Sequence, residues 1–320
     1  MNRLYFILLL ILAVPSCLKN PSQTGTPSKP HTDVAFDADS AYRYAAAQVA
    51  FGPRVPGSEA HSRCAEYLEN TLSRFADTVI TQRGSMTAYD GSQMPVRNII
   101  AALNADVKRR VMLSAHYDTR PWADQDADSG KWHTPIDGAN DGASGVAVLL
   151  EIARQLNAMH TDLGVDIVLW DAEDGGTPQF DEHGRHDSWC LGSQYWAKHK
   201  HKAGYEAQCG ILLDMVGAED ARFLLEQHSR QYAGSIMKSI WQTARRLGYG
   251  DIFVEQNAYP LVDDHYYLNL AGIPTVDIIH YDNQRGFPAQ WHTTKDNMDH
   301  ISPLTLGAVG HTVLDYIVNR

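Results

Sequence analysis

Acidic and histidine side chains recur at the ends of predicted strands in this sequence and just before one predicted helix. Asp141 lies in the glycine-rich turn IDGANDGASGV, directly before an apolar segment with helical spacing. The strand-like run VMLSAHYD ends near His116, and the run DIVLWDAED ends in Glu173 and Asp174. A catalytic zinc ion takes about three nitrogen or oxygen ligands from the protein and keeps one position open. These side chains therefore predict a metal site, although an aspartate just before a helix is also a common N-cap.

The residue types leave the ligand set open. Asp141 and one member of the pair Glu173-Asp174 offer carboxylate ligands, and a histidine completes the set. The histidine candidates are His116, His265 and His292. Neighbouring residues of a strand point to opposite faces, so Glu173 and Asp174 should have different roles unless the strand has already ended. One would bind the metal, and the other would face the substrate as a general base.

Simpler explanations exist for these residues. A solvated strand end accounts for Glu173 and Asp174, and a hydrogen-bonded core histidine accounts for His116. Trp291 could pack in the core or, with Phe287, could form the wall of a substrate pocket. An apolar wall with few polar groups suits a small uncharged side chain.

The elements that must position these side chains alternate along the chain. Strands are predicted at 78–83, 96–103, 111–116, 166–170, 210–216, 222–227, 252–256 and 273–279. Helices are predicted at 36–50, 59–75, 143–158, 190–200, 235–247, 264–270 and 301–318. Long irregular loops separate several of them, at 119–136, 175–189 and 281–297. This alternation predicts a three-layer α/β/α sandwich around a central mixed, largely parallel sheet.

In sheets of this kind, ligands bind outside the carboxyl ends of the strands. The side chains that fall at or near such ends are His116, Asp141, Glu173, Asp214 and Asp277. We therefore expect these residues to form one cluster.

The composition fits one large folded domain. The 320 residues are 44% apolar and 20% charged, which is enough apolar material for a sizeable core. The net charge of −11 argues against a nucleic-acid partner, because phosphate binding requires a basic face. The sequence shows no repeat of fixed period and no linker after residue 35, so residues 36–320 are predicted to form a single catalytic domain.

The first residues resemble an export signal. Residues 1–16, MNRLYFILLLILAVPS, combine one arginine, an apolar run too short to span a membrane and small residues before Cys17. The ending VPSC resembles a bacterial lipobox, although the proline is unusual there. We therefore expect a lipoprotein-type signal peptide, a lipid anchor on Cys17 and a flexible tether over residues 17–35. The expected location is periplasmic, attached to a bacterial membrane.

Three cysteines remain after Cys17, namely Cys64, Cys190 and Cys209. An odd number allows at most one internal disulfide bond, and the sequence does not choose the pair. Their spacing does not suggest a thiolate zinc site.

The order of these motifs resembles that of the M28 zinc aminopeptidase fold. The matching segments are FGPRVPGS (51–58), HYD (116–118), the turn with Asp141, WDAED (170–174), LLDMVGA (212–218), VDDH (262–265) and WHTTKDN (291–297). Within this superfamily the chain is similar to the glutaminyl-peptide cyclotransferases (glutaminyl cyclases), specifically to bacterial members related to the animal enzyme. The doubled acid before His265, the pair Trp291-His292 and LLDMVGA carry that similarity. It runs almost continuously from Ala41 to Arg320.

The resemblance implies one zinc ion held by Asp141, Asp174 and His292. It implies that Glu173 transfers protons as the catalytic base and acid. One departure from the family concerns these ligands, because position 174 carries aspartate where the family commonly has glutamate.

The resemblance also implies roles for residues around the metal. Asp214 and Asp263 would form an acidic pair beside Glu173. The residues implied to shape the substrate pocket are Trp291, Phe287 and Trp189. Asp277 stands where the animal enzymes carry a histidine, so its role stays open.

The implied activity is the conversion of an amino-terminal glutamine of peptides or exported proteins to pyroglutamate, with loss of ammonia. We expect a monomer that binds one zinc ion. A two-zinc aminopeptidase of the same fold is the nearest alternative, since His116, Asp141 and Asp214 could hold a second metal. A metal-free binding module is another, but a chain that had lost catalysis would have no reason to keep Asp141, Asp174 and His292 together.

Overall fold

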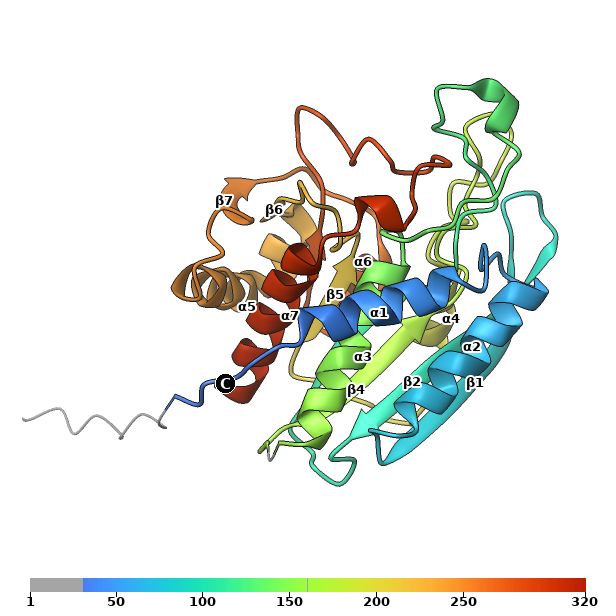
Figure 1. Ribbon diagram of the computed structural model, residues 1–320. Coiled ribbons are helices and arrows are strands. Elements are labelled where there is room, and N and C mark those ends of the chain that lie inside the picture. The colour runs from blue at the N-terminus through green and yellow to red at the C-terminus, as the bar shows by residue number, and fades with distance from the viewer. Residues whose placement is uncertain (1–30, 160) are drawn as a thin grey trace, which may run out of the picture. The chain divides into compact units, whose positions relative to one another are not determined.

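A six-stranded sheet runs through the centre of the computed structural model, which describes residues 31–159 and 161–320 (Figure 1). In the order in which they pair, the strands are β1 (Thr78–Thr87), β2 (Gln93–Leu103), β4 (Gly164–Trp170), β3 (Arg110–His116), β5 (Gly210–Asp214) and β8 (Thr275–Ile279). β1, β2 and β4 pair antiparallel, whereas β4, β3, β5 and β8 are parallel. The predicted mixed, largely parallel sheet is confirmed.

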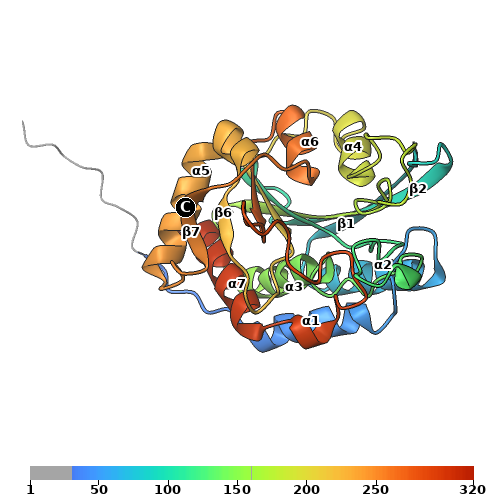
Figure 2. The same ribbon diagram turned by 90° about the horizontal axis from the view of Figure 1, so that it is seen from above.

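Helices cover both faces of this sheet, as Figure 2 shows. One face carries α1 (Ala38–Val49), α2 (Glu59–Leu72), α3 (Ala143–Asn157) and α7 (Pro303–Val318). The other carries α4 (Leu191–Lys198) and α6 (Asp264–Leu270), and α5 (Gln227–Arg246) continues this layer beside β8. The three-layer α/β/α architecture is therefore also confirmed.

The apolar composition of the central strands explains why they lie in the middle. Every residue of β3, β4, β5 and β8 is buried, as expected for parallel strands covered on both faces. Gly145 lets α3 approach the sheet closely, because a Cβ atom there would lie 2.2 Å from the carbonyl oxygen of Leu213. On the other face, Trp170 of β4 meets Trp196 of α4 edge to face, with ring centroids 5.7 Å apart.

The region of residues 222–247 differs from the prediction. The predicted strand at 222–227 shortens to β6 (Phe223–Leu225), which pairs with β7 (Phe253–Asn257) in a separate two-stranded sheet. The helix predicted from residue 235 begins at Gln227, because Glu226 caps its first turn. Ala233 has a non-helical backbone inside α5, and with the following glycine it interrupts the helical pattern of the sequence.

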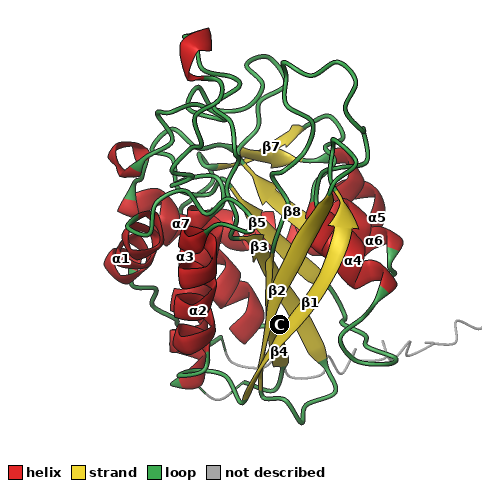
Figure 3. Cartoon of the chain, turned by 90° about the vertical axis from the view of Figure 1, so that its right-hand side faces the viewer, coloured by secondary structure: helices red, strands yellow, loops and turns green. Residues whose placement is uncertain are grey.

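Long loops gather at the carboxyl end of the parallel strands (Figure 3). They follow β3, β4 and β8, and two of them contain the short 3-10 helices Ser129–Lys131 and Met298–His300. The prediction placed Asp277 near such a strand end, but this residue is the third of five in β8 and pairs with Leu212. The strand ends at Ile279, as predicted, so Asp277 lies two residues before that end and inside the paired part of the sheet.

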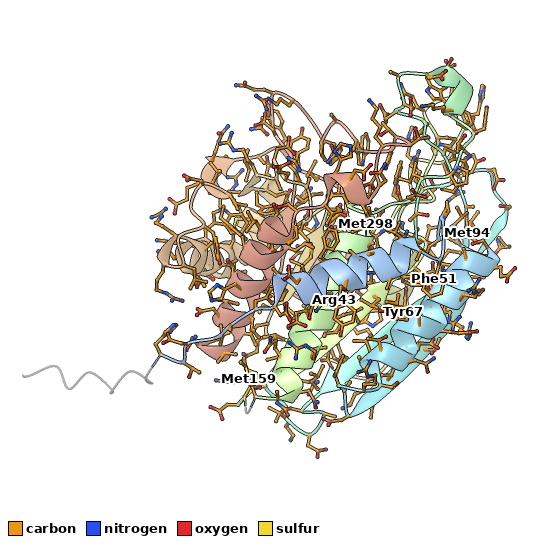
Figure 4. The ribbon with its side chains drawn as sticks, viewed as in Figure 1. Arg43, Phe51, Tyr67, Met94, Met159 and Met298 are labelled. Carbon is orange, nitrogen blue, oxygen red and sulfur yellow. The ribbon has the colours of Figure 1, made fainter. Side chains whose placement is uncertain are left out.

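The two ends of the described chain meet on the side away from these loops (Figure 1). Thr32 and Asn319 exchange two hydrogen bonds, of 2.7 and 3.0 Å, and residues Thr32–Arg320 form one compact unit. Near the start of this unit, Phe51 packs against Tyr67 with ring centroids 5.7 Å apart, which fastens the end of α1 to α2 (Figure 4).

The predicted signal peptide, Cys17 and most of the predicted tether lie outside the described residues. Among the helices of residues 31–159 and 161–320, none is long and apolar enough to cross a membrane.

Candidate metal centre and active site

Three side chains from distant parts of the chain meet at the loop-bearing end of the sheet. Nε2 of His292 lies 3.0 Å from Oδ1 of Asp174 and 3.6 Å from Oδ2 of Asp141. One ligand atom from each residue lies within 4.8 Å of the others. Tetrahedral ligands with zinc bonds of ~2.0–2.2 Å lie roughly 3.3 Å apart. The three side chains have the chemistry and the spacing of a zinc-binding set.

Asp174 provides the test of whether a cation fits. Both of its carboxylate oxygens are buried and have no hydrogen-bond partner among the described residues. Although Oδ1 lies 3.0 Å from Nε2 of His292, the two groups are not aligned as donor and acceptor. Buried polar atoms without partners are uncommon and indicate a missing ion or water. The donor set therefore fits a divalent cation.

Asp141 is held by its backbone, in the turn before α3. Its N–H group donates to Oδ2 of Asp296 at 3.1 Å, and Arg54 donates to the carbonyl oxygen of Gly138 at 2.7 Å. A Cβ atom at Gly142 would lie 2.4 Å from the carbonyl oxygen of His116, so only glycine fits there. Gly142 is also the N-cap of α3 and makes no side-chain capping bond. The simple explanation of Asp141 as a helix cap is therefore not what the structure shows.

The acidic pair Glu173-Asp174 follows the end of β4 at Trp170. Because the strand has ended, the two side chains are not forced to opposite faces, and both line the same cavity. Their backbone N–H groups both donate to the carboxylate of Asp118, at 3.1 Å each. Asp118 thereby fixes the loop that carries both acids.

His292 lies close to two indole rings. Its backbone is left-handed, with φ 54°, and its ring stacks on that of Trp291 at a centroid distance of 3.7 Å. The indole ring of Trp189 is parallel to the imidazole of His292, and the two ring centroids are 6.0 Å apart. Nδ1 of His292 lies 3.7 Å from Oδ1 of Asp124. A carboxylate behind a ligating histidine orients the ring and selects its tautomer.

A cavity of about 370 Å³ opens beside these residues. Glu173, Asp214 and Asp263 contribute its acidic side, together with Asp141 and Asp174. The apolar walls come from Trp189, Met215, Pro260, Leu261, Val262, Ile279, Phe287 and Trp291. The size suits a small side chain with a few polar groups rather than a bulky one.

His116 joins the site on its inner side. Its Nε2 lies 3.0 Å from Oδ1 of Asp141 and 3.3 Å from Oδ1 of Asp214, and these three residues form a second group that could hold a metal. Burial alone would lower the pKa of His116, but its contacts with carboxylates, first among them Asp118, outweigh burial and raise it well above the ordinary value. Asp141 is therefore shared between the two candidate ligand groups.

The electrostatics of the first ligand group favours a cation. Burial raises the pKa of Asp174 well above its ordinary value, and the nearby charge of Asp141 raises it further. Burial lowers the pKa of His292 well below its ordinary value, so the imidazole is neutral, which is the form that binds metals. A divalent cation would offset the repulsion between the two carboxylates.

The other acids of the cavity are also perturbed. Burial raises the pKa of Glu173 well above its ordinary value, although the charge of His116 opposes this. Burial raises the pKa of Asp214 to about 6. Burial, followed by the charge of Asp214, raises that of Asp263 to about 7. Such values suit groups that exchange protons near neutral pH.

Asp277 and His265 lie deeper, behind Asp263. Nδ1 of His265 is 3.4 Å from Oδ2 of Asp277, and its Nε2 is 3.1 Å from Oε2 of Glu226. Neither Asp277 nor His265 lines the cavity. His265, a ligand candidate from the sequence, is therefore not part of the group around Asp141.

Several supporting residues were missed by the sequence analysis. Arg120 binds both oxygens of Asp124, at 2.7 and 2.6 Å, and donates to the carbonyl oxygen of Asp174 at 3.1 Å. Asp296 accepts a hydrogen bond from the N–H group of Asp141, and the thiol of Cys190 contacts the carboxylate of Glu173. Their only signal in the sequence is that they lie in the same loops as the candidate ligands. Cys64, Cys190 and Cys209 are all buried free thiols, so the disulfide that the sequence allowed is absent among them.

Comparisons with known proteins place this site in context. A model of peptidase family M28 matches residues 98–317. The structure superposes on a glutaminyl cyclase from Bacteroides thetaiotaomicron, solved with bound N-acetylhistamine, with a TM-score of 0.88 and 51% sequence identity, covering 90% of this chain and 100% of that one. It superposes equally on a Zn-dependent exopeptidase from Parabacteroides distasonis, with a TM-score of 0.89 and 49% identity over 90% and 100% of the two chains.

A comparison of sequences also finds a glutaminyl-peptide cyclotransferase. The glutaminyl-peptide cyclotransferase of Gloydius blomhoffii is 24% identical over 281 residues, which are 79% of this chain and 73% of that protein. The names of these similar proteins thus indicate two different reactions: cyclisation of a terminal glutamine and release of a terminal residue.

Proposed function

Because the chain belongs to peptidase family M28, we propose that it is a zinc-dependent glutaminyl-peptide cyclotransferase, which converts an amino-terminal glutamine to pyroglutamate and releases ammonia. The observation that carries this proposal is a small cavity with indole walls, in which Glu173 lies beside one complete set of ligands. The similarity to a glutaminyl cyclase over almost the whole chain supports the same conclusion.

Asp141, Asp174 and His292 are the residues that would hold the zinc ion. When bound, zinc supplies a Lewis acid that polarises the γ-carbonyl group of the substrate glutamine. The protein fixes the ligands through Asp118, Asp124 and Asp296, so that little rearrangement is needed during the reaction.

Glu173 moves the proton in this reaction. It accepts a proton from the α-amino group, whose nitrogen attacks the γ-carbonyl carbon of the same residue. The new C–N bond closes a five-membered ring, the bond to the side-chain nitrogen breaks, and Glu173 returns the proton so that ammonia leaves. One residue supplies both nucleophile and electrophile, so the cavity mainly has to hold the glutamine in a folded conformation.

The cavity walls and the remaining acids complete the site. Trp189, Phe287 and Trp291 exclude water and enclose the aliphatic part of the glutamine. Asp214 and Asp263, with raised pKa values, would share a proton and bind the α-amino group or the leaving nitrogen.

A second candidate function rests on a specific observation. His116, Asp141 and Asp214 are close enough to hold another metal ion, and two bridged metals activate water in aminopeptidases. In that case the protein would release terminal residues, and Glu173 would act as the base for the water.

Two peptides that differ only at the first residue separate these functions. The purified protein is incubated with a peptide that begins with glutamine and with one that begins with leucine, and its metal content is measured by elemental analysis. We expect ammonia from the first peptide, no cleavage of the second, and one zinc ion per chain. Free leucine together with two zinc ions would establish the aminopeptidase. A protein that changes neither peptide and holds no metal would be a binding module.

The location is proposed from the first residues of the sequence. Residues 1–16 would direct export, and Cys17 would carry a lipid that anchors a monomeric enzyme to a membrane. Substrates would then be peptides or exported proteins with an amino-terminal glutamine. Metabolic labelling with a fatty acid, compared between the wild type and Cys17→Ala, tests the anchor.

A further inference from the structure

Cys190 lies against the carboxylate of the proposed catalytic base. Its Sγ atom is 3.2 Å from Oε1 of Glu173, and the residue is completely buried. The thiol carries one hydrogen that it can donate, and Oε1 of Glu173 accepts it. The contact is therefore a hydrogen bond from Cys190 to Glu173.

The backbone holds the two residues in register. The N–H group of Cys190 donates to the carbonyl oxygen of Glu173, and that of Leu191 donates to Ala172, both at 2.9 Å. Cys190 has a left-handed backbone, with φ 54°, and directly precedes α4. Gly192 keeps this turn close to the chain after β4, because a Cβ atom there would lie 2.3 Å from the carbonyl oxygen of Asp171. The position of the thiol is thus fixed by the first turn of α4.

The second oxygen of Glu173 has different surroundings. Oε2 lies 4.0 Å from Nδ1 of His116, beyond hydrogen-bond distance, and Glu173 lines the cavity. A hydrogen bond to Oε1 fixes the rotation of the carboxylate and leaves Oε2 free to exchange a proton with a ligand.

We propose that Cys190 is a positioning residue for proton transfer, whose S–H group holds Oε1 of Glu173 while the other oxygen faces the substrate. This role rests on the proposed function. Burial raises the pKa of the Cys190 thiol well above its ordinary value, and the charge of Glu173 raises it further. These effects favour the protonated thiol, which is the form that donates to Glu173.

Two substitutions separate the hydrogen bond from simple packing. Cys190→Ala removes the donor, and Cys190→Ser keeps a donor in a slightly smaller side chain. We expect kcat for a peptide that begins with glutamine to fall about tenfold in Cys190→Ala, with KM within about twofold. In Cys190→Ser, kcat should stay within about threefold of the wild-type value, and both variants should retain one zinc ion.

Cys64→Ala is the matched control. Cys64 is also a completely buried thiol, but it lies in α2 and packs in the hydrophobic core. It should lose thermal stability to a similar extent while keeping the wild-type kcat. Equal losses of kcat in Cys190→Ala and Cys190→Ser, or no loss in either, would overturn the proposal.

Crystal structures of the two Cys190 variants give a result that does not depend on turnover. The carboxylate of Glu173 should rotate in Cys190→Ala and keep its place in Cys190→Ser. An unchanged carboxylate in Cys190→Ala would refute the positioning role. If the wild-type protein forms no pyroglutamate, the proposed function fails, and these structures still decide the role of Cys190.

Discussion

Glu173 and Asp174 are adjacent acids with different surroundings. Asp174 faces His292, and neither of its oxygens has a hydrogen-bond partner in the described part of the chain. Glu173 instead accepts a hydrogen bond from Cys190 and lines the open part of the cavity. One position along the chain thus separates the proposed metal ligand from the proposed proton carrier.

The substitution Glu173→Gln tests this division. It keeps the size of the side chain but removes the group that accepts the proton, so we expect kcat to fall by at least about 100-fold. Bound zinc should remain at the wild-type level, which elemental analysis measures.

Asp174→Asn provides the comparison, since an amide is a poor zinc ligand. This variant should lose both zinc and activity. If Glu173→Gln lost its zinc and Asp174→Asn kept it, the roles of the two acids would be exchanged.

The types and order of the central residues could be predicted from the sequence, but their supports could not. Acids and histidines at strand ends stand out because strand ends converge at one edge of a parallel sheet. Asp118, Asp124 and Asp296 act through contacts with backbone groups or with a ring nitrogen in other loops. Such contacts depend on loop conformation, which local sequence does not determine.

At the scale of elements, Arg120 joins two of the active-site loops. It lies in the loop after β3, binds Asp124 in the same loop, and donates to the carbonyl oxygen of Asp174 in the loop after β4. Its guanidinium group also packs over the indole ring of Trp189, 4.7 Å from the centroid. A change at Arg120 should therefore affect Asp174 and, through Asp124, also His292.

We expect Arg120→Lys to weaken zinc binding about 10-fold to 100-fold, because lysine cannot bind both oxygens of Asp124 or stack on an indole. Competition with a chromogenic chelator measures the dissociation constant. Arg110→Lys is the control: Arg110 also binds both oxygens of an aspartate, Asp166, at 2.7 Å each, but at the opposite end of β3. It should lose stability and keep its zinc affinity. Equal weakening in both variants would show a general loss of packing.

The fold was predictable where the apolar pattern was regular. α6 was predicted with its observed bounds, and β3 and β4 were each predicted to within two residues. The start of α5 was missed, because it depends on the cap from Glu226 and not on apolar spacing. The end of β8 at Ile279 was predicted, but its start at Thr275 was not, since pairing with β5 decides where that strand begins.

At the scale of the whole molecule, Glu226 links the start of α5 to the segment that contains α6. Its carboxylate accepts hydrogen bonds from backbone N–H groups at the start of α5 and from Leu261, and it contacts His265. Burial alone would raise the pKa of Glu226, but the contact with His265 and these bonds outweigh burial and lower it to about 2. A depressed pKa means that the folded state favours the ionised form.

The stability that Glu226 contributes should therefore depend on pH. It is fully present above the unfolded-state pKa of about 4.5 and is lost as pH falls towards about 2. We expect Glu226→Gln to lower the free energy of unfolding at pH 6 by on the order of 3 kcal/mol. The difference from the wild type should shrink between pH 5 and pH 2.5.

Denaturant titrations with a chelator present measure this difference without a contribution from the metal. The exposed Glu206 provides the control, and Glu206→Gln should match the wild type at each pH. A difference for Glu226→Gln that stays constant over the range would contradict the assignment.

The candidate ligands at positions 141, 174 and 292 have a consequence beyond catalysis. An ion that binds all three would close two long stretches of polypeptide into rings and tie the segment before the last helix to the centre of the sheet. At a free ion concentration of 1,000 times the dissociation constant, binding would stabilise the native state by about 4 kcal/mol. Calorimetry should therefore show a lower melting temperature after chelation in the wild type, and no such change in His292→Ala. The same ion would then govern both turnover and the resistance of the folded chain to heat and proteases.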